Sequence, residues 1–319
     1  MTLLLTRADL APLFTEPETI AASLAVIRDA LRSSTAEPNA HQSWLAYPLG
    51  ISTEVKIHVN LLADPAGTSV RIFPPPSGPI AATGDSLCVL LDEAGQATAI
   101  MDVHELGSWR TSGVAAVACA ALAPDNARVL AVLGSGVEAA IFMRAIRVAL
   151  PGLREVRVHS RTPANRDRFA QQQTTEALPV RAVGTAQEAV AGADVIFAAA
   201  AGGQPLIAPE DVRPGALVNS VTWGTVPQNL PARRVVPDRF QPEARPTGWE
   251  PWPPRRGNEW GEPPLLLADV LRGTPARRFP DETLLYSQFG IFAWDAPLLA
   301  WAYEAARLRG LGTSFRFAG

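Results

Sequence analysis

The chain has 319 residues, of which 47% are hydrophobic and 18% are charged, a balance that is typical of folded proteins and excludes disorder as the dominant state. Its 28 Lys and Arg residues against 31 Asp and Glu give a net charge of −3, so no basic field favours a nucleic acid or a membrane surface as partner. We therefore expect a small-molecule partner, with neither nucleic acid nor membrane involved.

The two cysteines and the N-terminal residues predict the compartment. Cys88 and Cys119 each lie in an apolar run without metal-ligand spacing, which indicates buried thiols and no metal site. The start MTLLLTRADLAPLF lacks a basic segment followed by a long apolar one, and the apolar stretch 114–123 is too short to span a bilayer. We expect a cytoplasmic protein.

The first part of the chain predicts a helix followed by a sheet. Apolar residues at Ile20, Leu24, Ile27 and Leu31 have the spacing of one helical face. Strands are predicted in SWLAYPL, EVKIHVNLL, SVRIF and SLCVLLD, with turns at DPAG and EAG, and they favour an antiparallel or mixed sheet. The segment WRTSGVAAVACAALA predicts a helix of small residues suited to a tight interface or a domain junction.

From Ala127 onward, strands and helices alternate, which predicts a doubly wound, mainly parallel α/β sheet. The predicted strands are RVLAVLG, EVRVHSR, VRAV, DVIFAAAA, ALVNSVT and RRVVPD, and the predicted helices cover 137–150, 164–173 and TAQEAVAG. Helical periodicity returns in LLLADVLRGT and around 295–308, and GLGTSF predicts a C-terminal turn.

Residues 241–265 are rich in proline and carry Trp249, Trp252 and Trp260, a composition that excludes regular helix and central strand. An irregular surface loop pinned by buried indoles is one interpretation. A wall over the active site is the other.

The clearest chemical signal is VLAVLGSGVEAA, a strand that leads through Gly134, Gly136 and Ala139 into a helix. Gly134 permits a tight turn, Gly136 lets the backbone approach a pyrophosphate, and the helix N-terminus provides N–H groups for that anion. Because a second strand follows at the right distance, the motif favours a dinucleotide site over a turn without a ligand.

The second strand ends in Ser160, Arg161 and Thr162, where an NAD-specific site usually presents an acid to the ribose. A hydroxyl and a guanidinium suit a 2′-phosphate, so NADP(H) is preferred and NAD(H) is the alternative. Arg161 could also simply cap the end of the strand.

With these motifs in order, the chain resembles the ornithine cyclodeaminase and mu-crystallin family, which includes amino-acid dehydrogenases and ketimine reductases. The resemblance lies in four blocks: YPLGISTEVKIHVN, ELGSWRTSGVAA, LAVLGSGVEA with VHSRTP, and the stretch from ADVLRGTPARRFPDETLLYSQFG to ARLRGLGT. It implies a Rossmann-type domain at 126–289. Residues 1–125 with 290–319 would form a discontinuous α+β domain that binds substrate and builds a homodimer.

The resemblance also implies roles for individual residues. Lys56 would contact the substrate, and Arg110 would lie between substrate and cofactor. Gln288 would be a second substrate contact. The implied cofactor contacts are Arg110, Thr111, Gly134, Ser135, Gly136, Val137, Glu138, Ser160, Arg161, Thr162, Ala200, Val221 and Ser287.

Two departures from the family pattern bear on the reaction. Cyclodeaminases carry a proton-handling aspartate after the strand that corresponds to ALVNSVTWG, and here that position holds Gly224. A substrate-binding arginine after the first helix has no clear counterpart among Asn39, Ala40 and His41. Free ornithine is therefore an unfavourable substrate.

We accordingly favour an NAD(P)H-dependent oxidoreductase that reduces a cyclic imine or a 2-imino acid, compatible with a specialised biosynthetic pathway. Lys56, the only lysine of the chain, or His58, two residues further on the same face of the strand, could protonate the product amine. The structural alternatives are a solvent-facing lysine, a core histidine and, for Arg110, a salt bridge at a domain junction. An ammonia lyase with recycled NAD and a silent NADPH-binding protein remain the alternative functions.

Overall fold

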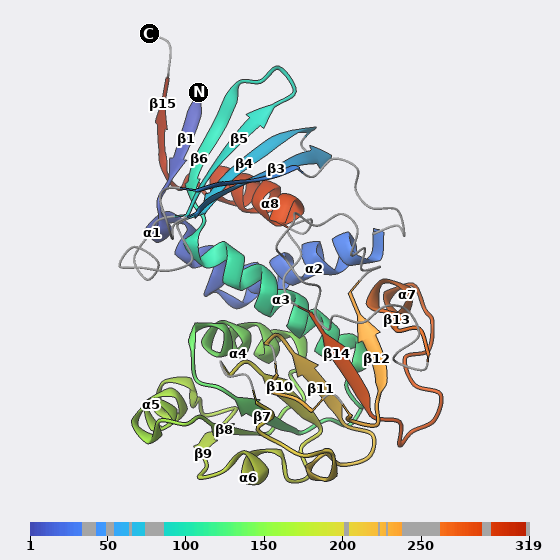
Figure 1. Ribbon diagram of the computed structural model, residues 1–319. Helices are drawn as coiled ribbons and strands as arrows, with labels where there is room; N and C mark the ends of the chain where they lie inside the picture. The colour runs from blue at the N-terminus through green and yellow to red at the C-terminus, as the bar shows by residue number, and fades with distance from the viewer. Residues whose placement is uncertain are drawn as a thin grey trace. The chain divides into compact units, whose positions relative to one another are not determined.

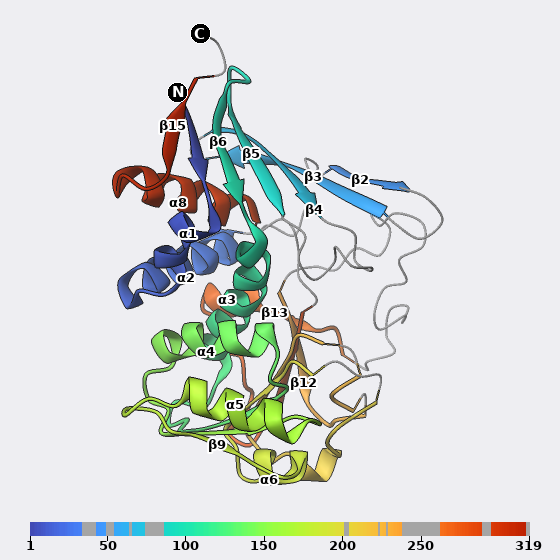
Figure 2. The same cartoon turned by 90° about the vertical axis from the view of Figure 1, so that its left-hand side faces the viewer.

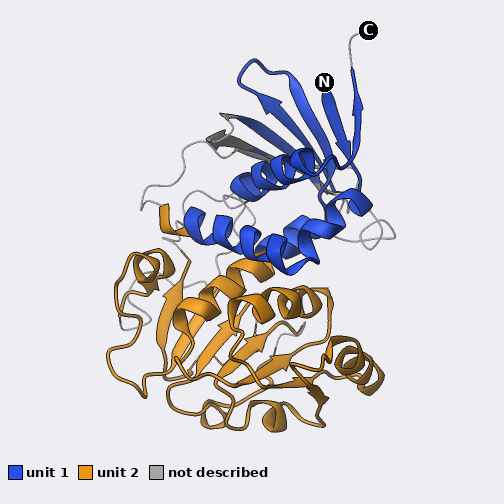
Figure 3. Cartoon of the chain, turned by 180° about the vertical axis from the view of Figure 1, so that it is seen from behind, with its two compact units in different colours: residues 1–30, 37–110, 291–319 blue, residues 31–36, 111–290 orange. Residues whose placement is uncertain are grey.

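The computed structural model describes residues 1–33, 43–48, 54–63, 66–73, 86–200, 204–222, 224–227, 229–237, 262–288 and 295–316. The chain divides into two compact units, residues 1–30, 37–110 and 291–319 in unit 1 and residues 31–36 and 111–290 in unit 2 (Figure 3). The roles that the sequence predicts for its two domains, at 1–125 with 290–319 and at 126–289, stay predictions.

Unit 1 contains a seven-stranded sheet in which only β1 and β6 pair in parallel among neighbouring strands (Figure 1). In spatial order the strands are β15 (Thr313–Phe315), β1 (Thr2–Leu5), β6 (Ala97–Asp102), β5 (Leu87–Asp92), β4 (Ala66–Phe73), β3 (Glu54–Ala63) and β2 (Ser43–Pro48).

Helices lie on one side of this sheet, with α8 against it (Figure 2). They are α1 (Arg7–Leu10), the 3₁₀ turn η1 (Ala11–Phe14), α2 (Pro17–Ser33) up to residue 30, the start of α3 (His104–Leu122), which belongs to unit 2 from residue 111, and α8 (Asp295–Leu308). Trp109 links α3 to η1 and α2, because its ring centroid lies 5.1 Å from that of Phe14 and its Nε1 donates to Ser23 Oγ. Within the described segments no single helix is long and apolar enough to cross a membrane, although α1 with η1 and α2 together reach that length across an 85° bend.

The two faces of the unit 1 sheet differ in burial. Arg71 stands opposite Cys88, and Cys88 stands opposite Met101, and all three side chains are buried. On the other face, Ile72 and its partner Leu87 are 40% and 43% exposed. Alternation along the strands therefore separates a packed face from an open apolar one.

Unit 2 is a Rossmann-type sheet of eight parallel strands with helices packed against it. In spatial order these are β13 (Leu265–Leu266), β12 (Arg233–Val236), β14 (Leu284–Ser287), β11 (Leu217–Ser220), β10 (Val195–Ala198), β7 (Val129–Leu133), β8 (Glu155–His159) and β9 (Val180–Ala182). The helical elements are α4 (Val137–Ala149), α5 (Pro163–Gln173), α6 (Ala186–Val190), η2 (Pro209–Asp211) and α7 (Leu267–Leu271). Strands β10 and β11 are buried at every position, as parallel strands covered on both faces must be.

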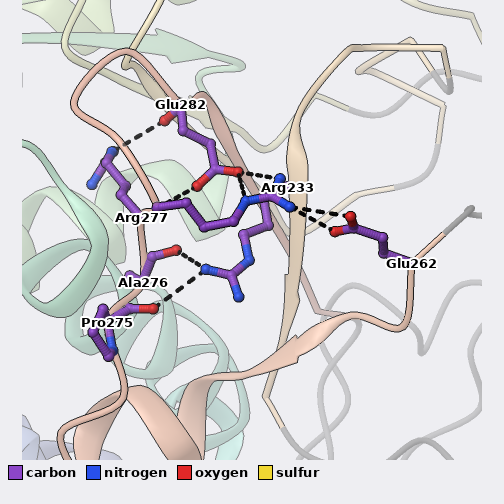
Figure 4. A network of polar contacts seen from close by, with 7 residues as sticks. Arg233, Glu262, Pro275, Ala276, Arg277 and Glu282 are labelled. Carbon is purple, nitrogen blue, oxygen red and sulfur yellow. Dashed lines mark hydrogen bonds and ion pairs between the residues drawn. The ribbon is translucent and has the colours of Figure 1, made fainter.

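A polar network fixes the segment that leads into β14 (Figure 4). Glu282 is 5% exposed, and it accepts 2.7 Å hydrogen bonds from the backbone N and from the Nε of Arg278. Arg278 also pairs with Glu262, and Arg233 donates to the backbone of Ala276 at 2.8 Å. The segment is thereby tied to β12 and to residue 262.

The structure confirms the α/β class, and it corrects one expectation at the end of the chain. GLGTSF was expected to form a turn, but residues 313–315 form β15, because their backbone pairs with the free edge of β1. The Pro/Trp-rich segment lies outside the described residues up to position 261, as do Asn39, Ala40 and His41.

Candidate functional site

The predicted cofactor residues of unit 2 follow the carboxyl ends of five neighbouring parallel strands, which share one edge of the sheet. Strand β7 lies between β8 and β10, so the chain reverses its direction of winding there, and ligands of such folds bind at this switch point. The residues concerned are Gly134–Glu138 after β7, Ser160–Thr162 after β8, Ala200 after β10, Val221 after β11, and Ser287 with Gln288 at the end of β14.

The backbone geometry of the fold requires a glycine at position 134. Its φ is +115°, and a Cβ at this position would lie 2.8 Å from the backbone of Ala199 and of Ala200. Its N–H donates to His159 O at 2.8 Å, so the turn also holds the end of β8. A side chain here would push the ends of β7 and β10 apart.

Gly136 presents the opposite case. It is the N-cap of α4 with φ −86° and ψ −170°, a conformation open to any residue, and a Cβ added to it would meet no atom within 4 Å. No side chain caps the helix, and neighbouring Val137 is 69% exposed. The α4 N-terminus therefore offers N–H groups beside open space, an arrangement that fits the phosphate of a dinucleotide.

Hydroxyl groups lie where the second strand ends. Ser135 Oγ donates to Ser160 Oγ at 3.0 Å, which joins the glycine turn to the end of β8. Arg161 and Thr162 are exposed, and the segment His159–Thr162 contains no carboxylate. The end of β8 therefore presents hydroxyl and guanidinium donors at this edge of the sheet.

Ser112 was not predicted, and it ties α3 to the cofactor turn. Its Oγ lies 3.0 Å from Glu138 O and 2.9 Å from Glu138 Oε2. The carboxylate of Glu138, in the first turn of α4, is thus held by a hydroxyl of α3. Because serine is common in small-residue helices, nothing in the sequence marked it.

Gln288 is buried and reaches two other segments. Its backbone N donates to Ser220 O at 3.1 Å, and its Nε2 donates to Thr111 O at 2.7 Å. Its Oε1 has no hydrogen-bond partner among the described residues. The side chain therefore offers one acceptor to a ligand.

The turn after β11 contains Gly224, the residue that the sequence predicts in place of the cyclodeaminase aspartate. Gly224 has φ +72°. The flanking Thr222 and Thr225 hydroxyls lie 3.0 Å apart, and Thr225 Oγ1 donates to Ala200 O at 3.0 Å. The described residues of this turn contribute threonine hydroxyls and a glycine in the left-handed conformation, and position 224 provides no carboxylate.

The predicted catalytic residues belong to unit 1. Lys56 in β3 stands opposite Ala46 and Phe73, and His58 stands opposite Arg71. Arg110 in α3 is buried, and its Nε lies 3.4 Å from Asp295 Oδ1. The union of these residues with the cofactor residues of unit 2 in one catalytic centre stays a prediction.

Arg71 and Asp295 are further charged residues that sequence reasoning missed. Both are buried, and Arg71 Nη1 donates to Asp295 Oδ2 at 2.8 Å. A signal existed, since Arg71 is a charge on the inward face of an apolar strand, and such a charge needs a partner. In the described part of the chain, no three His, Cys, Asp or Glu side chains are grouped to hold a metal ion.

Comparison with known proteins confirms the family resemblance. Residues 81–229 match the sequence profile of the Ornithine cyclodeaminase/mu-crystallin family. Over 127 residues, the chain is 37% identical to the ketimine reductase mu-crystallin of Macropus fuliginosus, which covers 40% of this chain and 39% of the relative. The chain thus matches about two fifths of the length of that relative.

Two further matches cover more of the chain. The Delta(1)-pyrroline-2-carboxylate reductase of Bacillus cereus is 27% identical over 235 residues, 70% of this chain and 72% of that protein. The structure of the Thermococcus litoralis Delta(1)-pyrroline-2-carboxylate reductase in complex with NADH and L-proline superposes with a TM-score of 0.79 at 20% identity, covering 98% of this chain and 100% of that one. At this identity the likeness shows the fold.

Proposed function

We propose that this chain, whose residues 81–229 match the sequence profile of the ornithine cyclodeaminase/mu-crystallin family, is an NAD(P)H-dependent reductase of a cyclic imine or ketimine. The observation that carries the proposal is the open space over Gly136 at the N-terminus of α4. The chain itself does not need a glycine there, whereas a pyrophosphate does. Relatives named as ketimine and pyrroline-2-carboxylate reductases support the same reaction class.

Different residues around the glycine turn after β7 would bind different parts of the cofactor. Gly134, Ser135, Gly136, Val137 and Glu138 would hold the pyrophosphate, with backbone N–H groups as donors. Ala200, Val221 and Ser287 would line the nicotinamide side, with Arg110 and Thr111 beside them. When bound, the reduced nicotinamide supplies the hydride that reduces a C=N bond.

NADP(H) is the proposed cofactor, with NAD(H) as the alternative. The Ser135–Ser160 hydroxyl pair and exposed Arg161 support this preference, since an arginine donates charge-assisted hydrogen bonds to a 2′-phosphate. Thr162 adds a further hydroxyl.

The substrate side is proposed to use Lys56, Arg110 and Gln288. A carboxylate or imine nitrogen of the substrate would meet the Lys56 and Arg110 cations, and Gln288 Oε1 is an acceptor available to an N–H. Protonation of the product amine requires one acid, for which Lys56 and His58 are the candidates. Ammonia loss would need a further proton-handling group, and position 224 carries none.

We also propose a homodimer in a reducing, cytoplasmic compartment. The apolar face with Ile72 and Leu87 supports self-association, because an exposed apolar patch of this kind marks an interface. Cys88 and Cys119 are free and buried, and burial raises the pKa of each thiol to about 12. Unreactive thiols of this kind suit a reducing environment.

The test of the reaction is stoichiometry. Purified protein is mixed with NADPH and Delta(1)-pyrroline-2-carboxylate or its six-membered homologue, and we expect one NADPH consumed per imine.

Lys56→Ala should leave NADPH affinity nearly intact and lower kcat/KM, because the lost group belongs to the substrate side. Release of ammonia from ornithine without added reductant, abolished by Lys56→Ala, would establish the lyase instead. Tight NADPH binding without turnover of any imine would establish a silent binding protein.

A second variant probes the missing carboxylate. Gly224→Asp restores the charge of a cyclodeaminase at a position whose φ of +72° an aspartate tolerates at some cost. We expect imine reduction to stay unchanged or fall, since the added carboxylate would repel the carboxylate of a substrate such as Delta(1)-pyrroline-2-carboxylate. A gain in imine reduction would contradict the assignment of position 224.

A further inference from the structure

Unit 1 contains a buried cluster of charges contributed by three segments far apart in the sequence. Arg71 comes from β4, Arg110 from α3 and Asp295 from the start of α8. The side chains of Arg71, Arg110 and Asp295 are 3%, 7% and 0% exposed. Burial of this kind is costly unless the charges hold one another in a defined geometry.

Asp295 is the centre of the cluster. Its Oδ2 accepts from Arg71 Nη1 at 2.8 Å, and its Oδ1 lies 3.4 Å from Arg110 Nε. It is also the first residue of the 14-residue helix α8, and a helix N-terminus favours a negative charge. Each carboxylate oxygen thus faces a different guanidinium.

Arg71 is itself held on several sides. Its Nε donates to Ser86 Oγ at 3.3 Å and its Nη2 to Val103 O at 3.3 Å. A Cβ on Gly107 would lie 2.7 Å from Arg71 Nη2, so the guanidinium packs against the α3 backbone where only glycine leaves room. Arg71 is therefore a fixed support for the carboxylate.

Arg110 receives its orientation from the same place. Its Nε lies 3.4 Å both from Asp295 Oδ1 and from Gly107 O, one turn earlier in α3. Contacts at Nε set the plane of a guanidinium, because the group is rigid and planar. A change at Asp295 would therefore turn that plane.

We infer that Asp295, braced by Arg71, is a positioning residue that fixes the guanidinium of Arg110 for substrate and cofactor. The inference rests on the proposed function, in which Arg110 meets both. Asp295 and Arg71 act only through Arg110. A misplaced group in an active site can cost about 10²-fold in rate, so the brace is a determinant of turnover.

The experiment compares two carboxylates of the same helix. Asp295→Asn removes the buried charge, and Glu304→Gln removes the partly exposed partner of Arg307 as a matched control. With NADPH and Delta(1)-pyrroline-2-carboxylate, we expect Asp295→Asn to lower kcat/KM by about tenfold or more, and Glu304→Gln to leave it within about twofold. Asp295→Glu should restore part of the loss, which a merely structural role does not predict.

A double-mutant cycle shows whether Asp295 acts through Arg110. In an Arg110→Ala background, Asp295→Asn should change kcat/KM by no more than about twofold, because the group it positions is gone. An equal, independent loss in both backgrounds would overturn the inference. So would wild-type kcat/KM in Asp295→Asn.

Folding is controlled with a charge-balanced pair. Arg71→Met combined with Asp295→Asn removes one positive and one negative charge together, a change that folded proteins often tolerate. If this variant has wild-type thermal stability and circular dichroism but reduced kcat, positioning is supported. If it folds and turns over like wild type, the inference fails. Wild-type protein that reduces no imine defeats the proposed function itself, and the positioning role falls with it.

Discussion

At the scale of single residues, the two glycines of the βα turn have different reasons to be glycine. Gly134 is fixed by its positive φ and by the backbone of Ala199 and Ala200. Gly136 has neither constraint. The sequence motif assigns a tight turn to Gly134 and a pyrophosphate contact to Gly136, and the packing shows that the fold needs a glycine at the first position and not at the second.

Alanine substitutions test this difference. Gly134→Ala should lower the free energy of unfolding by about 1–3 kcal/mol, since a side chain is strained at this φ and meets backbone. Gly136→Ala should change it by less than about 0.5 kcal/mol. The same Gly136→Ala should nonetheless weaken NADPH binding by about tenfold, or about 1.4 kcal/mol. Urea unfolding and fluorescence titration measure the two quantities, and unaltered NADPH affinity in Gly136→Ala would contradict a phosphate over this residue.

Arg161 is the residue on which cofactor choice should depend. Arg161→Ala should weaken NADPH binding by about 1.5–3 kcal/mol, the scale of a hydrogen bond to a charged group, and affect NADH far less. Arg168→Ala on α5, also an exposed arginine, serves as the control. Equal losses for both nucleotides would remove the 2′-phosphate assignment.

At the scale of elements, amphipathic helices and buried strands were predictable. Helix α2 and the alternation from β7 to β11 were found where apolar spacing placed them. Strands β1, β6 and β14 were missed, β13 was taken for part of a helix, and β15 was taken for a turn. The reason is physical, because β1 and β15 are four and three residues long and depend on pairing with a distant partner. Helix α3 begins at His104, before the predicted segment, since Asp102 Oδ1 accepts from His104 N.

In the candidate site, too, residues in a local motif were predictable and residues with distant partners were not. The glycine turn and the end of β8 could be located because a local motif carries them. Ser112 and Asp295 could not, because their partners are 26 and 224 residues away in the chain, and Arg71 carried a local signal that did not identify its partner. Contacts across such distances leave no periodic trace in a sequence.

The segment before β14 yields a prediction about acid stability. Burial opposes ionisation of Glu282, but hydrogen bonds from Arg278 outweigh it and hold the pKa of this carboxyl below its ordinary value of 4.5. A lowered pKa means that the carboxylate stabilises the fold above pH 4.5 and that this stabilisation is lost as the pH falls through the lowered value. Stability should therefore decline in the acid range.

Replacing the carboxylate isolates this contribution. Glu282→Gln should lower the free energy of unfolding by about 1–3 kcal/mol at pH 7, with the difference shrinking below pH 4.5. Glu262→Gln, which removes the exposed partner of the same Arg278, should cost no more than about 1 kcal/mol. Urea unfolding at several pH values measures both, and an equal cost for the two variants would show that burial of Glu282 is immaterial.

At the scale of the whole molecule, the open face of the unit 1 sheet predicts association of two copies. A stable homodimer buries on the order of 2,000 Å² or more, and a charge in that area would be desolvated without a partner. Ile72→Asp should therefore shift the protein toward a 34.0 kDa monomer in light scattering. Leu308→Asp, at a 76% exposed position on α8, is the control and should leave the mass unchanged. A wild-type monomer at micromolar concentration would exclude the dimer.

The place of β14 in the sheet sets an order of events during synthesis. The strand lies between β11 and β12, although it follows both in the sequence. Until residues 284–287 have left the ribosome, the edge of β11 has no permanent neighbour, and Asp295 follows only later. An unpaired edge of buried apolar residues invites wrong pairings while the chain grows. Both units thus stay incomplete until residues 284–295 have been synthesised, and nascent chains stalled before residue 284 should be the form that chaperones retain.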